Sequence, residues 1–145
     1  MYGRICVDHR PHKSEPNRTR LTVGGNLINY PGEKYTPTAD ISTAKILFNS
    51  VISSKNAKFM SLDLKDFYLM TPMPDHEYMW LPYDIIPDEI KKEYNLNELV
   101  HNGKIYAEIQ TGMYGLPQAG ILAYQNLKQH LEPYGYKPFT HTPGL

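Results

Sequence analysis

The stretch FMSLDLKDFYL, residues 59–69, decides the fold that this sequence predicts. Its first half belongs to an apolar run, 57–64, that we expect to form a buried strand with Asp63 near its end. A buried carboxylate is costly without a partner, and a metal ion is a common one. An aspartate in this position also serves as the cap of a following turn, so Asp63 alone leaves both roles open. Residues 66–69 are expected to form a short helical turn.

A second stretch, GMYGLPQAG at residues 112–120, opens a segment with helical spacing over 117–132. Pro117 is expected at the first helical position, where its missing N–H costs little, and Gly135 lies just past the end. The residues expected to face inward are Ala123, Leu127 and Leu131. The sequence therefore predicts a helix directly after the glycine-bounded stretch.

A first helix is predicted over 38–54, with Thr38 as its N-cap. An apolar stripe with a period of about 3.6 residues supports it and should face the core; it consists of Ile41, Ala44, Leu47, Phe48, Val51 and Ile52. A shorter helix is expected over 85–96, with Pro87 in its first turn.

Short strands and loops account for the remaining residues. Asn102-Gly103 favours a tight turn between strands at 99–101 and 104–109. Further strands are expected at 21–23, 77–81 and 134–139, and loops at 8–20 and 29–38. This order predicts an α+β fold with a mostly antiparallel sheet and two main helices.

Length and charge restrict the classes of function. With 145 residues the chain is one domain or part of one, and its net charge is zero. Residues 1–20 carry five Lys/Arg and two acids, a net of +3, and residues 75–98 carry seven acids and two lysines, a net of −5. These are either ordinary solvated faces or a basic end that meets phosphates and an acidic stretch that avoids them.

Cysteine content and hydropathy bear on the compartment. Cys6 is the only cysteine, so no intrachain disulfide can form, which favours a reducing, intracellular environment. No apolar run approaches membrane-spanning length, so no membrane partner is expected.

The stretches 59–69 and 112–120, about fifty residues apart and in this order, resemble motifs A and B of reverse transcriptases. Residues 20–26 resemble the fingers strand that precedes motif A, and the whole run from 18 to 145 is most similar to retrotransposon polyproteins of the Ty1/copia type. The resemblance implies part of the fingers and the first half of the palm of a right-hand polymerase, truncated at its C-terminal end. Residues 1–17 would form a polar N-terminal arm.

The resemblance also implies an activity and a set of partners. The intact family is an RNA-directed DNA polymerase that transfers deoxynucleotides to a primer 3′-end on an RNA or DNA template. It uses two Mg²⁺ ions, and the domain works beside the remainder of its polyprotein.

The same resemblance implies functional roles for the residues of this chain that match the family's motif positions. Asp63 matches the catalytic, metal-binding aspartate, and the backbone carbonyl of Leu64 also faces a metal. The positions that match nucleotide contacts are Asp66, Phe67, Tyr68, Gln118, Arg20 and Lys13. Without the motifs, Tyr68 would be interpreted as a packing aromatic, Gln118 as an exposed helix residue and Lys13 as a surface cation.

One departure limits the expected activity. Relatives carry an aromatic-x-Asp-Asp motif beyond motif B, whereas no Asp or Glu follows Glu132 in this chain. Two close Mg²⁺ ions need several anionic ligands, so we expect this chain to be inactive by itself. The alternatives are a non-catalytic remnant that binds nucleic acid or nucleotide, or the product of a truncated reading frame.

Overall fold

The computed structural model describes residues 1–36 and 38–139. Pro37, in the expected loop, and residues 140–145, in the expected domain, lie outside the described residues. The helices are α1 (Ile41–Ser53), α2 (Asp88–Glu93) and α3 (Ala119–Leu131), and the strands are β1 (Gly3–His9), β2 (Asn17–Val23), β3 (Pro72–Pro82) and β4 (Lys104–Thr111). Short 3-10 turns are η1 (Gly25–Leu27), η2 (Tyr83–Ile85), η3 (Leu96–Glu98) and η4 (Glu132–Tyr134). Within these described residues the α+β class is confirmed, with two antiparallel two-stranded sheets and three helices, of which α1 and α3 are the long ones.

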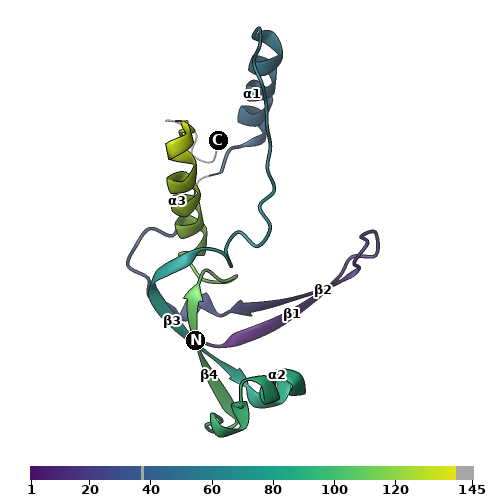
Figure 1. The fold of residues 1–145 in the computed structure, drawn as a ribbon, viewed down its shortest axis with the longest axis vertical. Helices are drawn as coiled ribbons and strands as arrows, with labels where there is room; N and C mark the ends of the chain where they lie inside the picture. Colours follow the sequence, from purple (N-terminus) through teal and green to yellow (C-terminus); the bar gives the residue numbers. More distant parts are fainter. Residues whose placement is uncertain (37, 140–145) are drawn as a thin grey trace.

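The strands β1 and β2 form a hairpin that projects from the body of the molecule (Figure 1). Cys6 pairs with Arg20 and Asp8 with Arg18, so the expected loop over 8–20 is wrong at its two ends and holds only for the turn between the strands. One face of this hairpin carries Ile5, Val7 and Leu21, and the other carries Arg4, Asp8, Arg18, Arg20 and Thr22. Apolar and polar residues therefore alternate along both strands, a pattern that the loop prediction over 8–20 did not use.

The strands β3 and β4 form the second sheet, in which Met79 pairs with Ala107. The predicted tight turn is confirmed, because Asn102 and Gly103 both have positive φ, 50° and 71°. It closes through reciprocal backbone hydrogen bonds between His101 and Lys104, but the expected strand at 99–101 is reduced to this single bridge. The long partner of β4 is β3, which extends beyond the expected 77–81.

The N-terminus joins the two sheets. The Met1 ammonium donates to the Tyr78 carbonyl at 3.0 Å, and Trp80 N–H donates to the Met1 carbonyl at 2.9 Å. Tyr2 forms a parallel bridge with Trp80, and their rings lie 6.2 Å apart. The hairpin is therefore anchored at its base while its tip extends into solvent.

The main core lies where the end of β2, the β3–β4 sheet and the start of α3 meet. Its buried residues are Val23, Met73, Met79, Ile109, Met113, Leu116 and Ala119. A smaller cluster under α2 consists of Ile86, Leu96 and Ile105. The predicted helix over 85–96 is shorter than expected, because Pro87 is its N-cap and Asn95 adopts a left-handed conformation.

The third helix begins later than expected. Gln118 is its N-cap residue and Ala119 its first residue, so the placement of Pro117 at the first helical position is wrong. A turn closed by Leu116 N–H to the Met113 carbonyl precedes it. Ala123 is buried as predicted, whereas Leu127 and Leu131 are only half-buried. After η4, Gly135 has φ of 85°, as expected for a helix end, and residues 134–139 form no regular strand.

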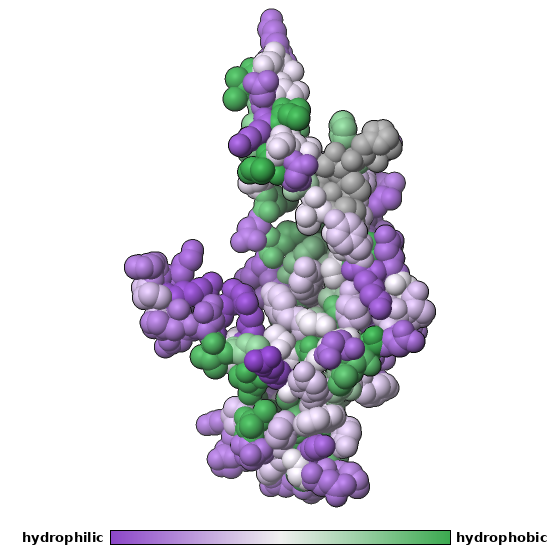
Figure 2. Space-filling view, turned by 180° about the vertical axis from the view of Figure 1, so that it is seen from behind, coloured by the Kyte–Doolittle hydropathy of each residue, from purple (hydrophilic) through white to green (hydrophobic). Residues whose placement is uncertain are grey.

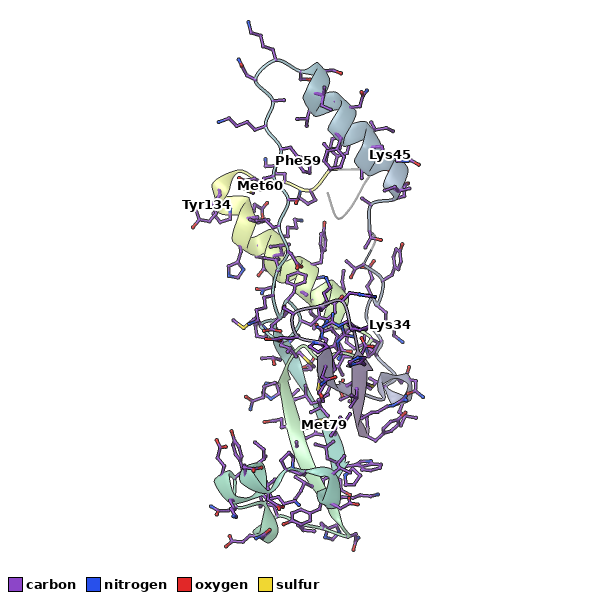
Figure 3. All side chains as sticks on the ribbon, turned by 90° about the vertical axis from the view of Figure 1, so that its right-hand side faces the viewer. Lys34, Lys45, Phe59, Met60, Met79 and Tyr134 are labelled. Atoms are coloured by element: carbon purple, nitrogen blue, oxygen red, sulfur yellow. The ribbon has the colours of Figure 1, made fainter. Side chains whose placement is uncertain are left out.

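The first helix stands away from the core (Figures 1 and 2). Asp40, not Thr38, caps it, because the Asp40 Oδ1 accepts from Thr43 N–H at 2.8 Å. None of its residues is buried, and Ile52 is 84% exposed, so its apolar stripe does not face the core as expected. The ring of Phe48 on this helix contacts that of Phe59, with centroids 4.5 Å apart; Figure 3 labels Phe59 beside the helix.

Residues 57–64 form an exposed irregular segment, so the buried strand ending at Asp63 is wrong. A strand needs a neighbouring strand to satisfy its backbone groups, and within the described ranges this segment pairs with none. Its apolar residues Met60 and Leu62 are more than half exposed. Among the residues that the structure describes, none of the helices has the length and apolar character needed to cross a membrane.

Candidate functional site

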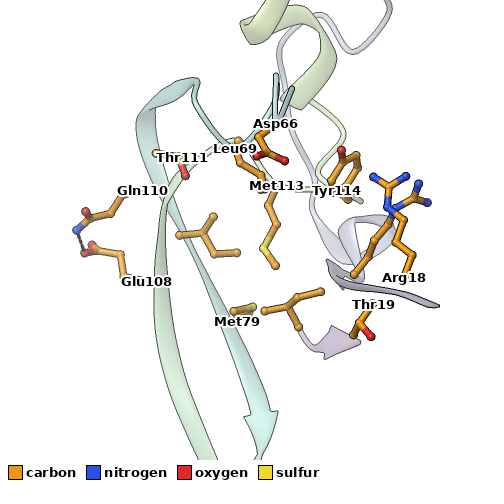
Figure 4. Close-up of a pocket in the computed structure, with 14 residues that line it drawn as sticks. Arg18, Thr19, Asp66, Leu69, Met79, Glu108, Gln110, Thr111, Met113 and Tyr114 are labelled. Carbon is orange, nitrogen blue, oxygen red and sulfur yellow. Dashed lines mark hydrogen bonds between the residues drawn. The ribbon is translucent and has the colours of Figure 1, made fainter. Parts of the chain in front are cut away.

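A pocket of about 450 Å³ lies between β2, the end of β4 and the Gly112–Tyr114 segment (Figure 4). The charged residues that line it include Arg18 and Arg20 on β2 and Asp66 on the turn before β3. Glu108 also lines it, but Figure 4 shows that carboxylate directed toward Gln110. The open side of the pocket therefore carries two guanidinium groups and one carboxylate.

Tyr114 links the two sides of this pocket. The Arg20 guanidinium carbon lies 5.6 Å from the centre of the Tyr114 ring, within cation–π range. The Tyr68 ring meets Tyr114 edge-on, with centroids 5.5 Å apart. Val23 N–H also donates to the Tyr114 carbonyl at 2.9 Å. The β1–β2 hairpin and the two sequence motifs are thus in direct contact.

Tyr68 of the first motif lies beside Gly112 and Gly120 of the second motif. A Cβ added at Gly112 would lie 2.6 Å from the Tyr68 carbonyl oxygen, and one at Gly120 would lie 4.0 Å from the Tyr68 hydroxyl. Gly112 N–H donates to the Thr71 carbonyl at 2.7 Å. Glycine at 112 is therefore required by the close approach of the two backbones.

The turn expected at 66–69 is present. Met70 N–H donates to the Asp66 carbonyl at 3.0 Å, and the Thr71 hydroxyl donates to the Phe67 carbonyl at 2.9 Å. Asp66 has φ of 54°, a left-handed conformation that aspartate tolerates better than most residues. Phe67 and Tyr68 are half-buried, with rings 6.0 Å apart.

Asp63 and Leu64 lie in the exposed segment and do not line the pocket. Mg²⁺, which the family resemblance implies, prefers several oxygen ligands. Within residues 1–36 and 38–139, no three His, Cys, Asp or Glu side chains come together closely enough to hold a metal ion. Asp63 and the Leu64 carbonyl do not by themselves make a two-ion site.

Gln118 and Lys13 lie away from the pocket that Arg20 lines. Gln118 is buried, not exposed, and its Nε2 donates to Glu77 Oε1 at 3.3 Å beside a second, smaller pocket. Lys13 lies in the turn of the β1–β2 hairpin, where its N–H donates to the Arg10 carbonyl. The structure therefore brings together Arg20, Asp66 and Tyr68 but not Gln118 or Lys13.

Sequence reasoning missed Tyr114. One signal in the sequence was its position directly before Gly115 in the second motif. A glycine lets another backbone segment approach closely, so the neighbouring aromatic ring is expected to lie at a contact between segments. Arg18, two residues before Arg20 on β2, also lines the pocket.

A polar cluster lies on the exposed surface of the β3–β4 sheet. Glu108 accepts hydrogen bonds from the Gln110 amide at 2.8 Å and the Tyr78 hydroxyl at 2.9 Å, and its Oε1 lies 3.1 Å from His76 Nδ1. These contacts, led by that of Gln110, lower the pKa of Glu108 to about 2. The same hydrogen bond to Glu108 raises the pKa of Tyr78.

Comparisons of this chain with protein-family models, with curated proteins and with solved structures find no match.

Proposed function

We propose that this chain is the fingers and first half of the palm of a retrotransposon-type RNA-directed DNA polymerase, and that the larger pocket binds the triphosphate of a deoxynucleotide. One observation carries the proposal: Arg20 from β2 and Asp66 from the first motif meet Tyr114 of the second motif around a single pocket. These three segments are far apart in sequence, and their convergence on one pocket supports the proposal.

The chemistry of the pocket fits this ligand. The planar guanidinium groups of Arg18 and Arg20 can each hold phosphate oxygens through two parallel hydrogen bonds. A volume of about 450 Å³ is within the range of small-molecule sites. Tyr68, packed on Tyr114 beside the pocket, is the aromatic residue proposed to lie under the sugar and to exclude a ribose 2′-hydroxyl.

The proposed function includes Mg²⁺ because the family that this chain resembles uses it. Asp63 and the Leu64 carbonyl would contribute two ligands, and further carboxylates would have to join them before two ions could be held. We therefore propose that this chain binds nucleotide but does not extend a primer when alone.

Nucleotide binding is tested by titrating the purified chain with dTTP in a calorimeter. Losing one doubly hydrogen-bonded phosphate contact corresponds to roughly a tenfold or larger loss of affinity. We expect that loss for Arg20→Gln. Arg4→Gln is the matched control, because Arg4 is on the same hairpin, pairs with Thr22 and does not line the pocket. Equal effects of the two variants would reject the pocket as the triphosphate site.

Polymerisation is tested on a DNA-primed RNA template with Mg²⁺. We expect no incorporation from the native chain or from Asp63→Ala. Incorporation that disappears in the variant would contradict the proposed inactivity and identify Asp63 as catalytic.

The second candidate function is non-catalytic binding of nucleic acid. It is favoured by the pairing of the hairpin, which places Arg4, Arg18 and Arg20 on one face, because cross-strand partners and alternate residues share a side. In this case affinity for a single-stranded oligonucleotide falls steeply with salt. Arg4→Gln then weakens binding as much as Arg20→Gln does, which distinguishes it from the nucleotide site.

A further inference from the structure

The larger pocket carries one charge that a triphosphate by itself does not favour. Its two arginines, Arg18 and Arg20, attract phosphate oxygens, but Asp66 lines the same pocket with a carboxylate. Figure 4 shows the Asp66 carboxylate directed into the space that Met113 and Tyr114 border. Because like charges repel, this carboxylate opposes the ligand that the two arginines attract.

Asp66 has no charged partner among the residues that the structure describes. No ion pair joins its carboxylate to Arg18 or Arg20 there, and the residue is exposed in the turn before β3. Its φ of 54° explains why a small polar residue occupies this position, since aspartate and asparagine both tolerate the left-handed conformation. Asparagine would satisfy the backbone equally well, so the conformation does not account for the negative charge.

A divalent cation removes the conflict between the carboxylate and the triphosphate. Mg²⁺ keeps several of its waters and is commonly held by one or two carboxylates together with substrate phosphates. Asp66 supplies one carboxylate and a triphosphate supplies the phosphate oxygens, so the pocket fits this cation. The Asp66 carboxylate would then attract a nucleotide that carries Mg²⁺ and repel one that does not.

The position of Asp66 suits this role better than that of Asp63. Asp63 lies in the exposed segment before the turn and does not line the pocket, whereas Asp66 does. The Asp66 carboxylate and the Arg18 side chain lie on opposite sides of the Tyr114 ring in Figure 4. A ligand that reaches both must therefore carry more than one anionic group, as a triphosphate does.

We propose that the Asp66 carboxylate holds the divalent cation that accompanies the triphosphate, so that this chain binds the magnesium complex of a deoxynucleotide in preference to the free nucleotide. This inference rests on the proposed nucleotide site. It adds a metal ligand to that site, because the family resemblance implies only a nucleotide contact for Asp66 and implies the metal for Asp63 and Leu64.

The test compares the affinity for dTTP in Mg²⁺ with the affinity in EDTA, both measured by calorimetry. For the native chain we expect roughly tenfold tighter binding in Mg²⁺. Asp66→Asn removes the charge and keeps a residue that tolerates the left-handed turn. This variant should bind free dTTP more tightly than the native chain does and should gain nothing from Mg²⁺. Asp75→Asn, at an exposed aspartate outside this pocket, is the matched control and should keep the native preference.

A change of metal preference tests direct ligation by residue 66. A thiolate is a softer ligand than a carboxylate and favours softer cations such as Cd²⁺. Asp66→Cys should therefore bind dTTP more tightly in Cd²⁺ than in Mg²⁺. The native chain, which also contains Cys6, is the control for Cd²⁺ bound elsewhere. The same metal preference in both proteins would overturn the proposal, because a purely structural role of Asp66 does not change which cation is chosen.

The metal ligand and the nucleotide site fail in different ways. If Arg20→Gln weakens dTTP binding but Asp66→Asn keeps the native Mg²⁺ preference, the nucleotide site stands and the metal ligand is overturned. Loss of that preference in Asp63→Asn but not in Asp66→Asn overturns it as well. If the native chain binds dTTP in neither buffer, the proposed function and this inference are both overturned.

Discussion

Gly115 and Val23 lie in backbone contact, so closely that a Cβ at Gly115 would clash with the Val23 carbonyl oxygen. Gly115 also has φ of +100°, a conformation that other residues rarely adopt. This contact fixes the base of the β1–β2 hairpin against the second motif, and it therefore fixes the position of Arg20 relative to Tyr114.

Gly115→Ala should accordingly be strongly destabilising. The positive φ and the steric overlap together should cost about 3 kcal/mol in the free energy of unfolding. Gly103→Ala is the control, because Gly103 has φ of +71° but no atom within 4 Å of an added Cβ, so only about 1 kcal/mol is expected. Urea denaturation measures both, and equal losses would contradict the close contact.

Tyr114 should act through its ring and not through its hydroxyl. Tyr114→Phe keeps both ring contacts and should leave the unfolding free energy almost unchanged. Tyr114→Leu loses the edge-on contact with Tyr68 and the cation–π contact with Arg20, for a loss of about 1–2 kcal/mol. Tyr134→Leu, at an exposed tyrosine, is the control for the substitution itself. The prediction fails if Tyr114→Phe destabilises the protein as much as Tyr114→Leu.

The sequence predicted correctly those parts of the fold that neighbouring residues in the chain determine. Asn102-Gly103 specifies its turn because both residues tolerate positive φ. The 13-residue helices α1 and α3 follow from periodic apolar residues. The convergence of residues 66–69 with 112–120 was expected only through the family resemblance, because no local rule relates segments so far apart.

The errors arise where tertiary contacts decide. The apolar run at 57–64 has strand composition, but among the described residues its Phe59 packs on Phe48 and no strand pairs with the run, so it stays irregular. The β1–β2 hairpin is the opposite case, since its outer end pairs the polar residues Asp8 with Arg18 and His9 with Asn17, although strand composition is absent there. Gln118 is buried because Glu77 on β3 accepts its amide proton across the core, a pairing that helix spacing cannot predict.

The cap of α1 gives a local prediction. Asp40→Ala removes the acceptor for Thr43 N–H, whereas Asp40→Asn keeps one. Since α1 has no buried residue, the change should be confined to that helix. Hydrogen exchange should become roughly fivefold faster for the first-turn amides of α1 in Asp40→Ala and stay near native in Asp40→Asn. Faster exchange in β3 or β4 would show that α1 is coupled to the core.

Glu108 gives the sharpest pH prediction. Its hydrogen bonds from Gln110 and Tyr78, with the His76 contact, lower its pKa from 4.5 to about 2 in the folded chain. A carboxyl whose pKa is depressed by folding stabilises the folded state fully above its unfolded pKa. That contribution is lost as pH falls through the folded value. The native chain should therefore lose this stabilisation between about pH 4.5 and pH 2.

Two measurements check this behaviour. The side-chain carboxyl carbon of Glu108 should titrate near pH 2 by NMR. Glu108→Gln removes the ionisable group, so its urea midpoint should fall less steeply than that of the native chain over the same pH interval. Parallel curves for the two proteins would mean that the hydrogen bonds to Glu108 do not favour its charged form, because the exposed cluster on the β3–β4 sheet would then be hydrated and not paired.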